Sequence, residues 1–182
     1  AVTRLLAPYT RPQPGLRAML WRLCSVSVYR MIPSPAYRLR RAVLVAFGAR
    51  LDRTSRVRGG VRISSPWNLT LGRKSSIGEG ATIWAHAPIT IGSRSVISQY
   101  CVVSSASLQQ GQDQDYESPD PIEVGDDVWV AAESVILGGM RIPNGALVGA
   151  RSVIDGPLEP WKIATGHPAV SRRERDYQGV KS

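Results

Sequence analysis

Side chains that bind metals or crosslink a fold are scarce in this chain. Its 182 residues include two cysteines, Cys24 and Cys101, which lie far apart and belong to no CxxC or Cys/His pattern. Neither a disulfide framework nor a zinc site is therefore expected, and a reducing cytoplasm is the compartment that fits. The chain has two histidines, His86 and His167, so a metal centre built from three histidines is excluded by count.

A long uninterrupted hydrophobic run is also missing. The most apolar stretches are residues 16–32, which are broken by Arg17, Arg22 and Arg30, and residues 42–47, which are too short to cross a bilayer. We therefore expect no transmembrane helix and no signal peptide, and we expect a cytoplasmic protein.

Acidic residues are nearly absent from the first third of the chain. Residues 1–62 contain thirteen arginines and one acid, Asp52, so their net charge is +12. The net charge of the whole chain is +9, which leaves −3 for residues 63–182. An arginine-rich amphipathic segment with a tryptophan is typical of a helix on an anionic membrane surface, or of one that reaches a phosphate-bearing acceptor. A helix packed on its own domain with its arginines in solvent is the alternative. Nucleic acid is not an expected partner, because no binding module accompanies the basic residues.

What the sequence has in abundance is a six-residue period of aliphatic side chains. The first nine members form three sets of three, and each set begins twenty residues after the previous one. A helix repeats every 3.6 residues and a strand every two, so neither explains a period of six. The pattern predicts a mainly β fold, a left-handed parallel β-helix with three short strands per turn and these side chains along its axis. The members are Leu51, Val57, Ile63, Leu71, Ile77, Ile83, Ile91, Ile97, Val103, Val124, Val130, Ile136, Ile142, Val148 and Ile154.

Small residues accompany the aliphatic ones at fixed offsets. Four positions after most of them comes a residue such as Ser75, Ser95 or Cys101, which we expect to fill a corner of the prism from inside, with Met140 as an oversized exception. Cys101 is accordingly predicted to be an inward-facing side chain and not a nucleophile. A glycine follows several aliphatics directly, and we expect it to form a turn with positive φ. These glycines are Gly72, Gly78, Gly92, Gly125 and Gly149.

Three segments follow from this pattern. Residues 1–50 form a basic helical segment, with helices over 16–31 and 36–47 separated by Pro33 and Pro35. Residues 51–156 form the hexapeptide-repeat β-helix, from which a polar loop, 104–123, protrudes. Residues 157–182 form a C-terminal tail. A loop of this length inside a compact repeat is usually functional.

Several stretches match a known family in order and spacing. The sequences FGARLDR, PWNLTLG, PITIGSRSVISQY, PIEVGDDVWVAAESVILGGMRIPNGALVGARSVI and PWKIATGHPAV resemble the acetyltransferases of exopolysaccharide clusters, of the colanic acid type, and more broadly the maltose, galactoside and serine acetyltransferases. The resemblance runs from about Leu20 to Ala169. It implies a homotrimer with active sites in the clefts between neighbouring prisms, where acetyl-CoA or another acyl-CoA and a sugar hydroxyl bind without a metal. The γ-class carbonic anhydrases share the coil, but their three zinc-binding histidines are not available here.

The resemblance fails at positions that carry the family's chemistry. A histidine in the protruding loop is the family's general base, and in an ungapped alignment it falls on Leu108, with the adjacent acid on Gln109. Residues 104–123 contain no histidine at all. A lysine that often meets the CoA phosphate is replaced by Asp155, and the asparagine of the C-terminal motif is replaced by His167.

The candidate base is therefore His86. It follows Ile83, one coil before the corner at which the loop leaves after Val103, so a stacked prism sets the two corners above one another. A surface histidine without a role is the alternative, and the loop carboxylates Asp113, Asp115 and Glu117 are further candidates. Predicted acceptor contacts are Trp84, Trp129, Ser105, Ser107 and Leu108. Residues that the resemblance implies for acyl-CoA are Ala131, Ala132, Gly149 and Ala150, and the guanidinium groups of Arg172 and Arg173 suit the CoA phosphates.

Three functions remain open at this point. The chain is expected to be an O-acyltransferase that acts on a sugar or a glycosylated small molecule. It could also be a trimeric pseudo-acetyltransferase that organises a partner, or an enzyme on the same scaffold that catalyses cyclisation or isomerisation in a natural-product pathway. Trp129 could fill an interface, and the tail arginines could be solvated.

Overall fold

Three short helices precede the repeat: α1 (Leu16–Val26), α2 (Val28–Met31) and α3 (Tyr37–Ala46). They belong to a computed structural model that describes residues 15–33, 35–109 and 116–176, with only the backbone of 107–109 and 116–117. Both predicted helices are present, but the first is broken at Ser27, whose ψ of −95° is not helical. Of the helices in these described ranges, none is long and apolar enough to cross a membrane.

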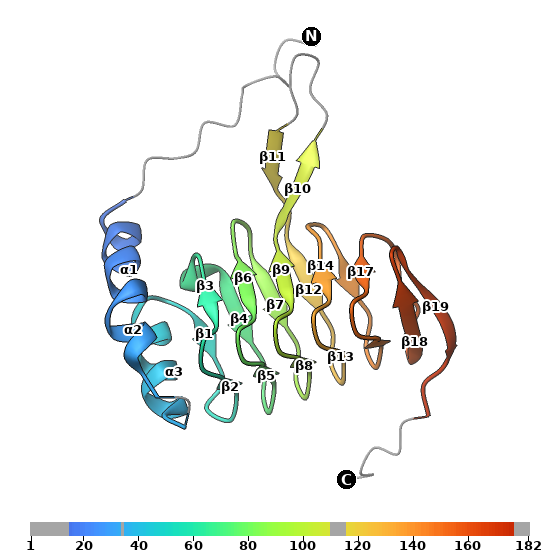
Figure 1. Cartoon of the computed structure of the whole chain (residues 1–182), viewed down its shortest axis with the longest axis horizontal. Coiled ribbons are helices and arrows are strands. Elements are labelled where there is room, and N and C mark those ends of the chain that lie inside the picture. Colours follow the sequence, from blue (N-terminus) through green and yellow to red (C-terminus); the bar gives the residue numbers. More distant parts are fainter. Residues whose placement is uncertain (1–14, 34, 110–115, 177–182) are drawn as a thin grey trace.

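Short strands then stack into three parallel sheets, which form the three faces of a prism (Figure 1). The first face consists of β1 (Arg50–Leu51), β4 (Leu69–Leu71), β7 (Ile89–Ile91), β12 (Ile122–Val124) and β15 (Arg141–Ile142), with the 3₁₀ turn η1 (Pro66–Asn68) before β4. The second face consists of β2 (Arg56–Val57), β5 (Ser76–Ile77), β8 (Val96–Ile97), β13 (Trp129–Val130) and β16 (Leu147–Val148). The third face consists of β3 (Arg62–Ile63), β6 (Thr82–Trp84), β9 (Val102–Ser104), β14 (Val135–Ile136) and β17 (Val153–Ile154). The predicted mainly β fold, a parallel β-helix, is thereby confirmed.

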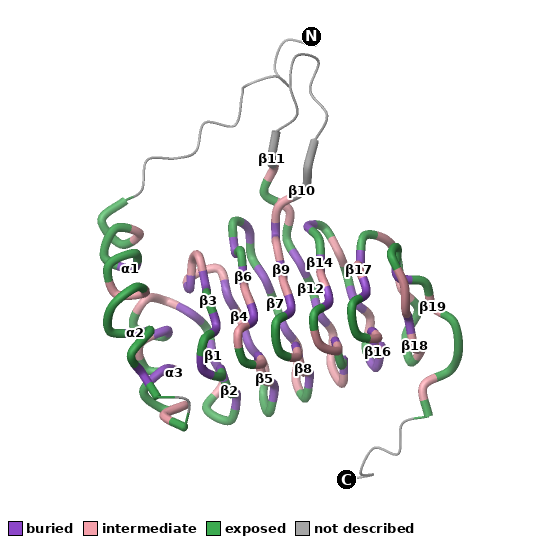
Figure 2. The backbone as a smooth tube through the Cα atoms, viewed as in Figure 1, coloured by how far each residue is buried: buried purple, intermediate pink, exposed green. Residues whose placement is uncertain are grey.

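The strand register shows what the period of six encodes. On the third face Ile83 pairs with Val103, and on the first face Leu71 pairs with Ile91, so equivalent positions of successive coils lie above one another. All of the periodic aliphatic side chains are buried, and they form a continuous core along the axis (Figure 2). Each such side chain stabilises the fold by about 1.5–3 kcal/mol relative to an exposed one.

The small residues fill the corners as predicted. Ser95 is fully buried, and its hydroxyl donates to the carbonyl of Gly125 in the next coil at 2.7 Å. Cys101 is likewise fully buried, with its Sγ 3.1 Å from the carbonyl oxygen of Ala131. Burial raises the pKa of the Cys101 thiol, which keeps it protonated and unreactive.

The prediction that the periodic glycines have positive φ is wrong. Positive φ occurs two residues later, for example at Lys74 (57°) and Arg94 (57°), whereas Gly72 and Gly92 lie outside that region. Glycine occurs at these positions because the backbone of the next coil lies too close for a side chain. A Cβ on Gly72 would lie 2.7 Å from the carbonyl carbon of Gly92, closer than real Cβ atoms come to backbone.

Two hairpins complete the chain. The expected loop at 104–123 begins and ends with antiparallel strands, β10 (Ala106–Gln109) and β11 (Tyr116–Pro119). The expected tail is an antiparallel hairpin of β18 (Lys162–Gly166) and β19 (Ala169–Glu174), and β18 pairs with β16 to extend the second face. Arg175 ties the end of this hairpin to the coils by donating to the carbonyls of Asp127 (2.7 Å) and Gly145 (2.9 Å).

The helices close the opposite end of the prism. Trp21 is buried against Tyr29 and Phe47, and its indole nitrogen donates to the carbonyl of Ile63 at 2.9 Å. Arg40 is also buried and donates to the carbonyl of Val57 in the first coil. These contacts satisfy backbone groups that the first coil would otherwise leave unpaired.

Candidate active site

His86 lies in the bend that connects β6 to β7, at the corner between the third and first faces. Its side chain is exposed, and its ring is parallel to that of Trp84, with the centroids 6.3 Å apart and an interplanar angle of 5°. The amide of Asn68 donates to the carbonyls of Ala85 (2.8 Å) and His86 (3.3 Å). The bend that carries the imidazole is therefore held by the preceding coil, while the imidazole itself is open to solvent.

The β10–β11 hairpin leaves the prism one coil further on, above His86. Trp84 pairs with Ser104 in the register of β6 and β9, which confirms the predicted stacking of the two corners. We call this region, with Trp84, His86 and Ser105, the hairpin corner. Adjacent coils lie about 4.8 Å apart.

Ser105 has a structural place in the hairpin corner. It is fully buried, its hydroxyl accepts a hydrogen bond from the Ala87 N–H at 2.8 Å, and it donates to the Ala87 carbonyl at 2.9 Å. Its own carbonyl accepts from the N–H of Asp120 at 3.0 Å. The residue predicted to contact an acceptor thus fastens both ends of the hairpin, a role that its small size at a buried corner position could have indicated.

The other hairpin candidates lie outside the described side chains. Ser107 and Leu108 belong to β10, where they pair with Ser118 and Glu117 of β11. Asp113 and Asp115 lie outside the described residues altogether, and the Glu117 side chain is not described.

A second group of predicted residues gathers at the corner between the second and third faces, which we call the alanine corner. Ala131 and Ala132 follow β13, and Gly149 and Ala150 follow β16 in the next coil. Backbone hydrogen bonds join the two turns, from the Ala131 N–H to the Val148 carbonyl and from the Arg151 N–H to the Ala132 carbonyl. The result is a column of small side chains where a ligand could approach the backbone.

The C-terminal hairpin brings an arginine to the end of this column. Thr165 lies over Gly149, because the Gly149 N–H donates to the Ala164 carbonyl at 2.8 Å, and Arg172 Nε donates to the Thr165 hydroxyl at 3.0 Å. Arg173 is exposed next to Arg172 on β19. The contact through Thr165 was not foreseen, since nothing in the sequence singles this threonine out.

Trp129 lies on the second face, and its side chain points toward the alanine corner. Its indole nitrogen donates to the hydroxyl of Ser98 at 3.0 Å, and Ser98 directly follows β8, which pairs with β13. The ring remains about half exposed. Asp155, by contrast, follows β17 on the third face, so it does not share the alanine corner.

Within one chain the two corners do not meet. The predicted base and Trp84 are at the corner between the third and first faces, while the residues predicted to hold acyl-CoA are at the corner between the second and third faces. His167, the other histidine, is exposed in the turn between β18 and β19. Trp129, predicted together with Trp84 and Ser105 as an acceptor contact, lies on the second face near the alanine corner, so a single copy does not bring the predicted acceptor contacts together.

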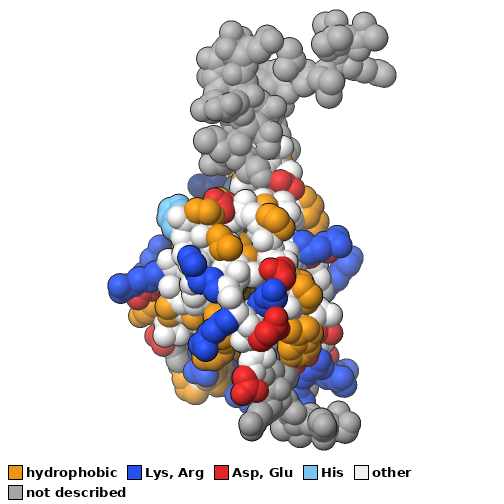
Figure 3. Space-filling model, turned by 90° about the vertical axis from the view of Figure 1, so that its right-hand side faces the viewer, with side chains coloured by type: hydrophobic (Ala, Val, Ile, Leu, Met, Phe, Trp, Pro, Cys, Tyr) orange, Lys and Arg blue, Asp and Glu red, His pale blue; other side chains and the backbone are white. Residues whose placement is uncertain are grey.

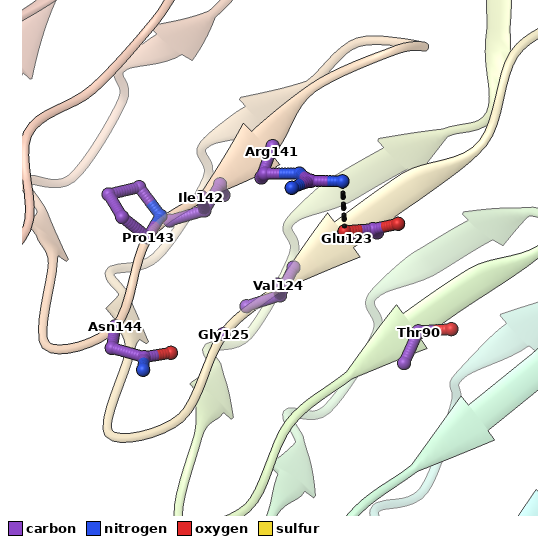
Figure 4. Close-up of a pocket in the computed structure, with 8 residues that line it drawn as sticks. All are labelled: Thr90, Glu123, Val124, Gly125, Arg141, Ile142, Pro143 and Asn144. Carbon is purple, nitrogen blue, oxygen red and sulfur yellow. Dashed lines mark ion pairs between the residues drawn. The ribbon is translucent and has the colours of Figure 1, made fainter.

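A shallow hollow on the first face was not predicted. It encloses about 290 Å³ beside β12 and β15, and the Arg141 guanidinium and Glu123 carboxylate form an ion pair of 2.8 Å across its wall (Figure 4). Both side chains are largely exposed. Over residues 15–33, 35–109 and 116–176 no cluster of three or more His, Cys, Asp or Glu side chains could hold a metal.

The chain is similar to known acetyltransferases in sequence and in structure. It is 32% identical over 161 residues, 88% of each chain, to the putative colanic acid biosynthesis acetyltransferase WcaF of Escherichia coli K12. A maltose O-acetyltransferase from Clostridium difficile 630 superposes with a TM-score of 0.77 at 18% identity, covering 90% of each chain. The hexapeptide-repeat acetyltransferase VCA0836 of Vibrio cholerae, solved with acetyl coenzyme A, gives a TM-score of 0.75 at 24% identity and covers 88% of this chain and 86% of that one.

No protein-family model matches the sequence. The identity and coverage of the WcaF match are nevertheless sufficient to show the family. The chain belongs to the family of the colanic acid-type hexapeptide-repeat acetyltransferases.

Proposed function

We propose that the protein is an O-acyltransferase that uses acetyl-CoA or another acyl-CoA and acts on a hydroxyl of a sugar or a glycosylated small molecule. The observation that carries this proposal is the alanine corner, where Ala131, Gly149 and Arg172 come together. The chain's family, that of the colanic acid-type acetyltransferases, supports it. Small side chains allow the pantetheine close to the backbone, and a guanidinium is a suitable partner for phosphate.

His86 is the base in this proposal. His86 lies one coil from the point where the β10–β11 hairpin leaves the prism. A general base must come within hydrogen-bond reach of the acceptor hydroxyl, directly or through one water. The parallel ring of Trp84 supplies an apolar surface of the kind that sugar rings pack against. Proton removal and stabilisation of the tetrahedral oxyanion by an amide are the two tasks that the site must perform.

The active unit is a homotrimer in this proposal. Outward side chains of the first face are polar, whereas those of the other two faces are apolar from the third coil onward and only partly covered in one chain. Neighbouring copies would cover this surface and set the hairpin corner of one copy beside the alanine corner of the next. The outward apolar residues are Val96, Trp129, Leu147 and Ile163 on the second face and Val102, Val135 and Val153 on the third.

Three measurements test the proposed activity and the proposed trimer. Calorimetric titration with CoA and acetyl-CoA should show binding, and release of free thiol should accompany transfer to a sugar acceptor. Light scattering at micromolar concentration should give the mass of three chains. A monomer would overturn the intermolecular site, and absence of CoA binding would overturn the acyltransferase assignment.

A second candidate function rests on Leu108. This residue occupies the place of the family's loop histidine, and a pseudo-acetyltransferase that binds or organises a pathway partner would need no base there. CoA binding without turnover would favour that function. Turnover of a pathway intermediate without CoA binding would favour a repurposed enzyme on the same fold.

Contact of the basic segment 1–50 with a membrane is also part of the proposal. Its support so far is the charge of the segment.

A further inference from the structure

The N-terminal helices expose an apolar stripe that the fold itself does not use. Five side chains of α1, at positions 16, 19, 20, 23 and 26, lie on one side of the helix and are 50–74% exposed. The side of α1 that packs on the prism is a different one, with Trp21 buried and Cys24 partly buried. A surface helix ordinarily turns its apolar stripe to the core, so this orientation needs an external partner. The five residues are Leu16, Met19, Leu20, Leu23 and Val26.

α2 continues the same exposed surface. Val28 is 60% exposed and Met31 is 81% exposed. Figure 2 shows that most residues of α1 and α2, at one end of the prism, are exposed. We call the seven residues of the two helices the apolar stripe.

The charge around the apolar stripe has one sign. Arg22, Arg30 and Arg38 are exposed on the three helices, and no Asp or Glu occurs before Asp52. The first coil adds further exposed arginines, including Arg56 and Arg58 on the second face. An apolar surface bordered only by cations matches the boundary between lipid phosphates and acyl chains.

The opposite end of the molecule provides the contrast. Figure 3 shows that basic and acidic side chains alternate there over the C-terminal hairpin and the last coils. Lys162 pairs with Glu159 at 2.6 Å, and Arg151 pairs with Glu133 at 2.8 Å. Mixed charges of this kind suit a solvated surface.

A second copy of the chain is a poor partner for the apolar stripe. A contact between two such stripes would set arginines against arginines, and juxtaposed like charges oppose association. The helices also lie at the end of the prism, away from the faces that we assign to the trimer (Figure 1). In a trimer of parallel prisms, three helical ends face the same side, so one flat surface can bind all three and gain from multivalency.

We infer that the helical end docks on an anionic lipid bilayer. The apolar stripe enters the boundary between headgroups and acyl chains, and Arg22, Arg30 and Arg38 contact lipid phosphates. This inference specifies the membrane contact proposed above and does not depend on the acyltransferase chemistry. Deleting the segment is an unsuitable test, because Trp21 and Arg40 close the end of the prism and the coils would lose their cover.

The test uses the full chain and surface variants. In flotation with vesicles of phosphatidylcholine containing about a third phosphatidylglycerol, the parent protein should bind, and on pure phosphatidylcholine it should not. Leu20→Glu with Leu23→Glu should lower the partition coefficient at least tenfold, and Arg22→Glu with Arg30→Glu should lower it as well. The matched control is Leu137→Glu with Val170→Glu, two exposed apolar residues of the coil and the C-terminal hairpin, which should partition like the parent.

Several outcomes would overturn the inference. These are equal binding to neutral vesicles, unchanged binding of the Leu20/Leu23 variant, and failure of the parent to bind any vesicle, which would leave the stripe to a protein partner. Loss of the trimer in the Leu20/Leu23 variant, seen by light scattering, would make the stripe a contact between copies. CoA titration of the same samples without vesicles separates this inference from the acyltransferase proposal, because a docking variant should keep the CoA affinity of the parent.

Discussion

The hairpin corner and the alanine corner differ in what the family requires of them. At the alanine corner Ala131, Ala132, Gly149 and Ala150 match the small residues that the resemblance implies, and in the proposed function they act through backbone and small size. At the hairpin corner the stacking is regular, with Ile83 next to Val103 of the following coil, but by the sequence resemblance Leu108 falls where a histidine is expected. In the proposed function, a ligand groove made of backbone therefore follows from the coil itself, whereas a proton-transfer group is a single side chain that can change without cost to the fold.

The largest effect is expected at the hairpin corner. His86→Ala should lower kcat by about 10²-fold or more while the CoA affinity stays unchanged, because a general base contributes to the chemical step and not to binding at the other corner. Steady-state kinetics with a transferred acceptor and calorimetry with CoA measure the two effects separately.

The control for that variant is His167→Ala, which removes the other exposed histidine. Leu108→His in the His86→Ala background should recover part of the turnover if the hairpin still reaches the acceptor. Full turnover of His86→Ala alone would show that the base lies elsewhere and would direct attention to the hairpin carboxylates.

A smaller effect is expected from Gly149→Ala at the alanine corner. The new Cβ would lie 2.7 Å from Thr165 Cγ2, so Thr165 must move, and with it the hydrogen bond that positions Arg172. We expect a loss of about 1–3 kcal/mol in unfolding free energy, which denaturant melts would measure. We also expect weaker CoA binding, which calorimetry would measure. Gly156→Ala, where a Cβ meets nothing within 4 Å, should leave both values unchanged.

Arg172→Ala should act on binding alone. Removing an exposed guanidinium from a phosphate is expected to weaken CoA binding by about 1 kcal/mol, roughly fivefold, and to reduce the salt dependence of that binding. Arg141→Ala is the control, since its ion pair with Glu123 lies on the first face, which does not border the alanine corner. Equal effects of the two variants would argue against a phosphate at Arg172.

Asp155→Lys is expected to have the smallest effect. It places a cation where the family often has lysine, and it should tighten CoA binding by up to about 1 kcal/mol, because the position is exposed. Asp155 follows β17 and not β16, so any gain would show that the phosphates reach the third face. Unchanged affinity would assign the phosphates to the C-terminal hairpin.

The sequence was sufficient for the coil because one rule repeats there. Every periodic aliphatic residue must be buried in the same way, so the positions of Ile83, Val103 and Ile136 follow from counting. The role of glycine was harder to predict, because a short distance between coils and a positive φ both select glycine, and only the backbone geometry at Gly72 distinguishes them.

The site was predictable only in part, because its members are held by contacts between distant segments. Counting placed His86 beneath the hairpin, but not the parallel ring of Trp84 or the contact of Arg172 with Thr165. Net charge indicated a basic N-terminal segment without showing that α1 packs through Trp21 and turns its leucines outward. Helix orientation depends on which side chain fits the open end of the prism, and composition does not determine that.

The way in which Ser105 fastens the hairpin makes that loop an exchangeable unit. The chain leaves the coil at Ser105 and returns at Asp120, and the hydrogen bond between their backbones closes the interruption. Everything between these residues can lengthen, shorten or change composition at a small entropic cost, because loop closure depends only weakly on length. The loop can therefore be exchanged while the stacked coils remain as they are, and grafting a relative's loop between positions 105 and 120 should yield a folded protein.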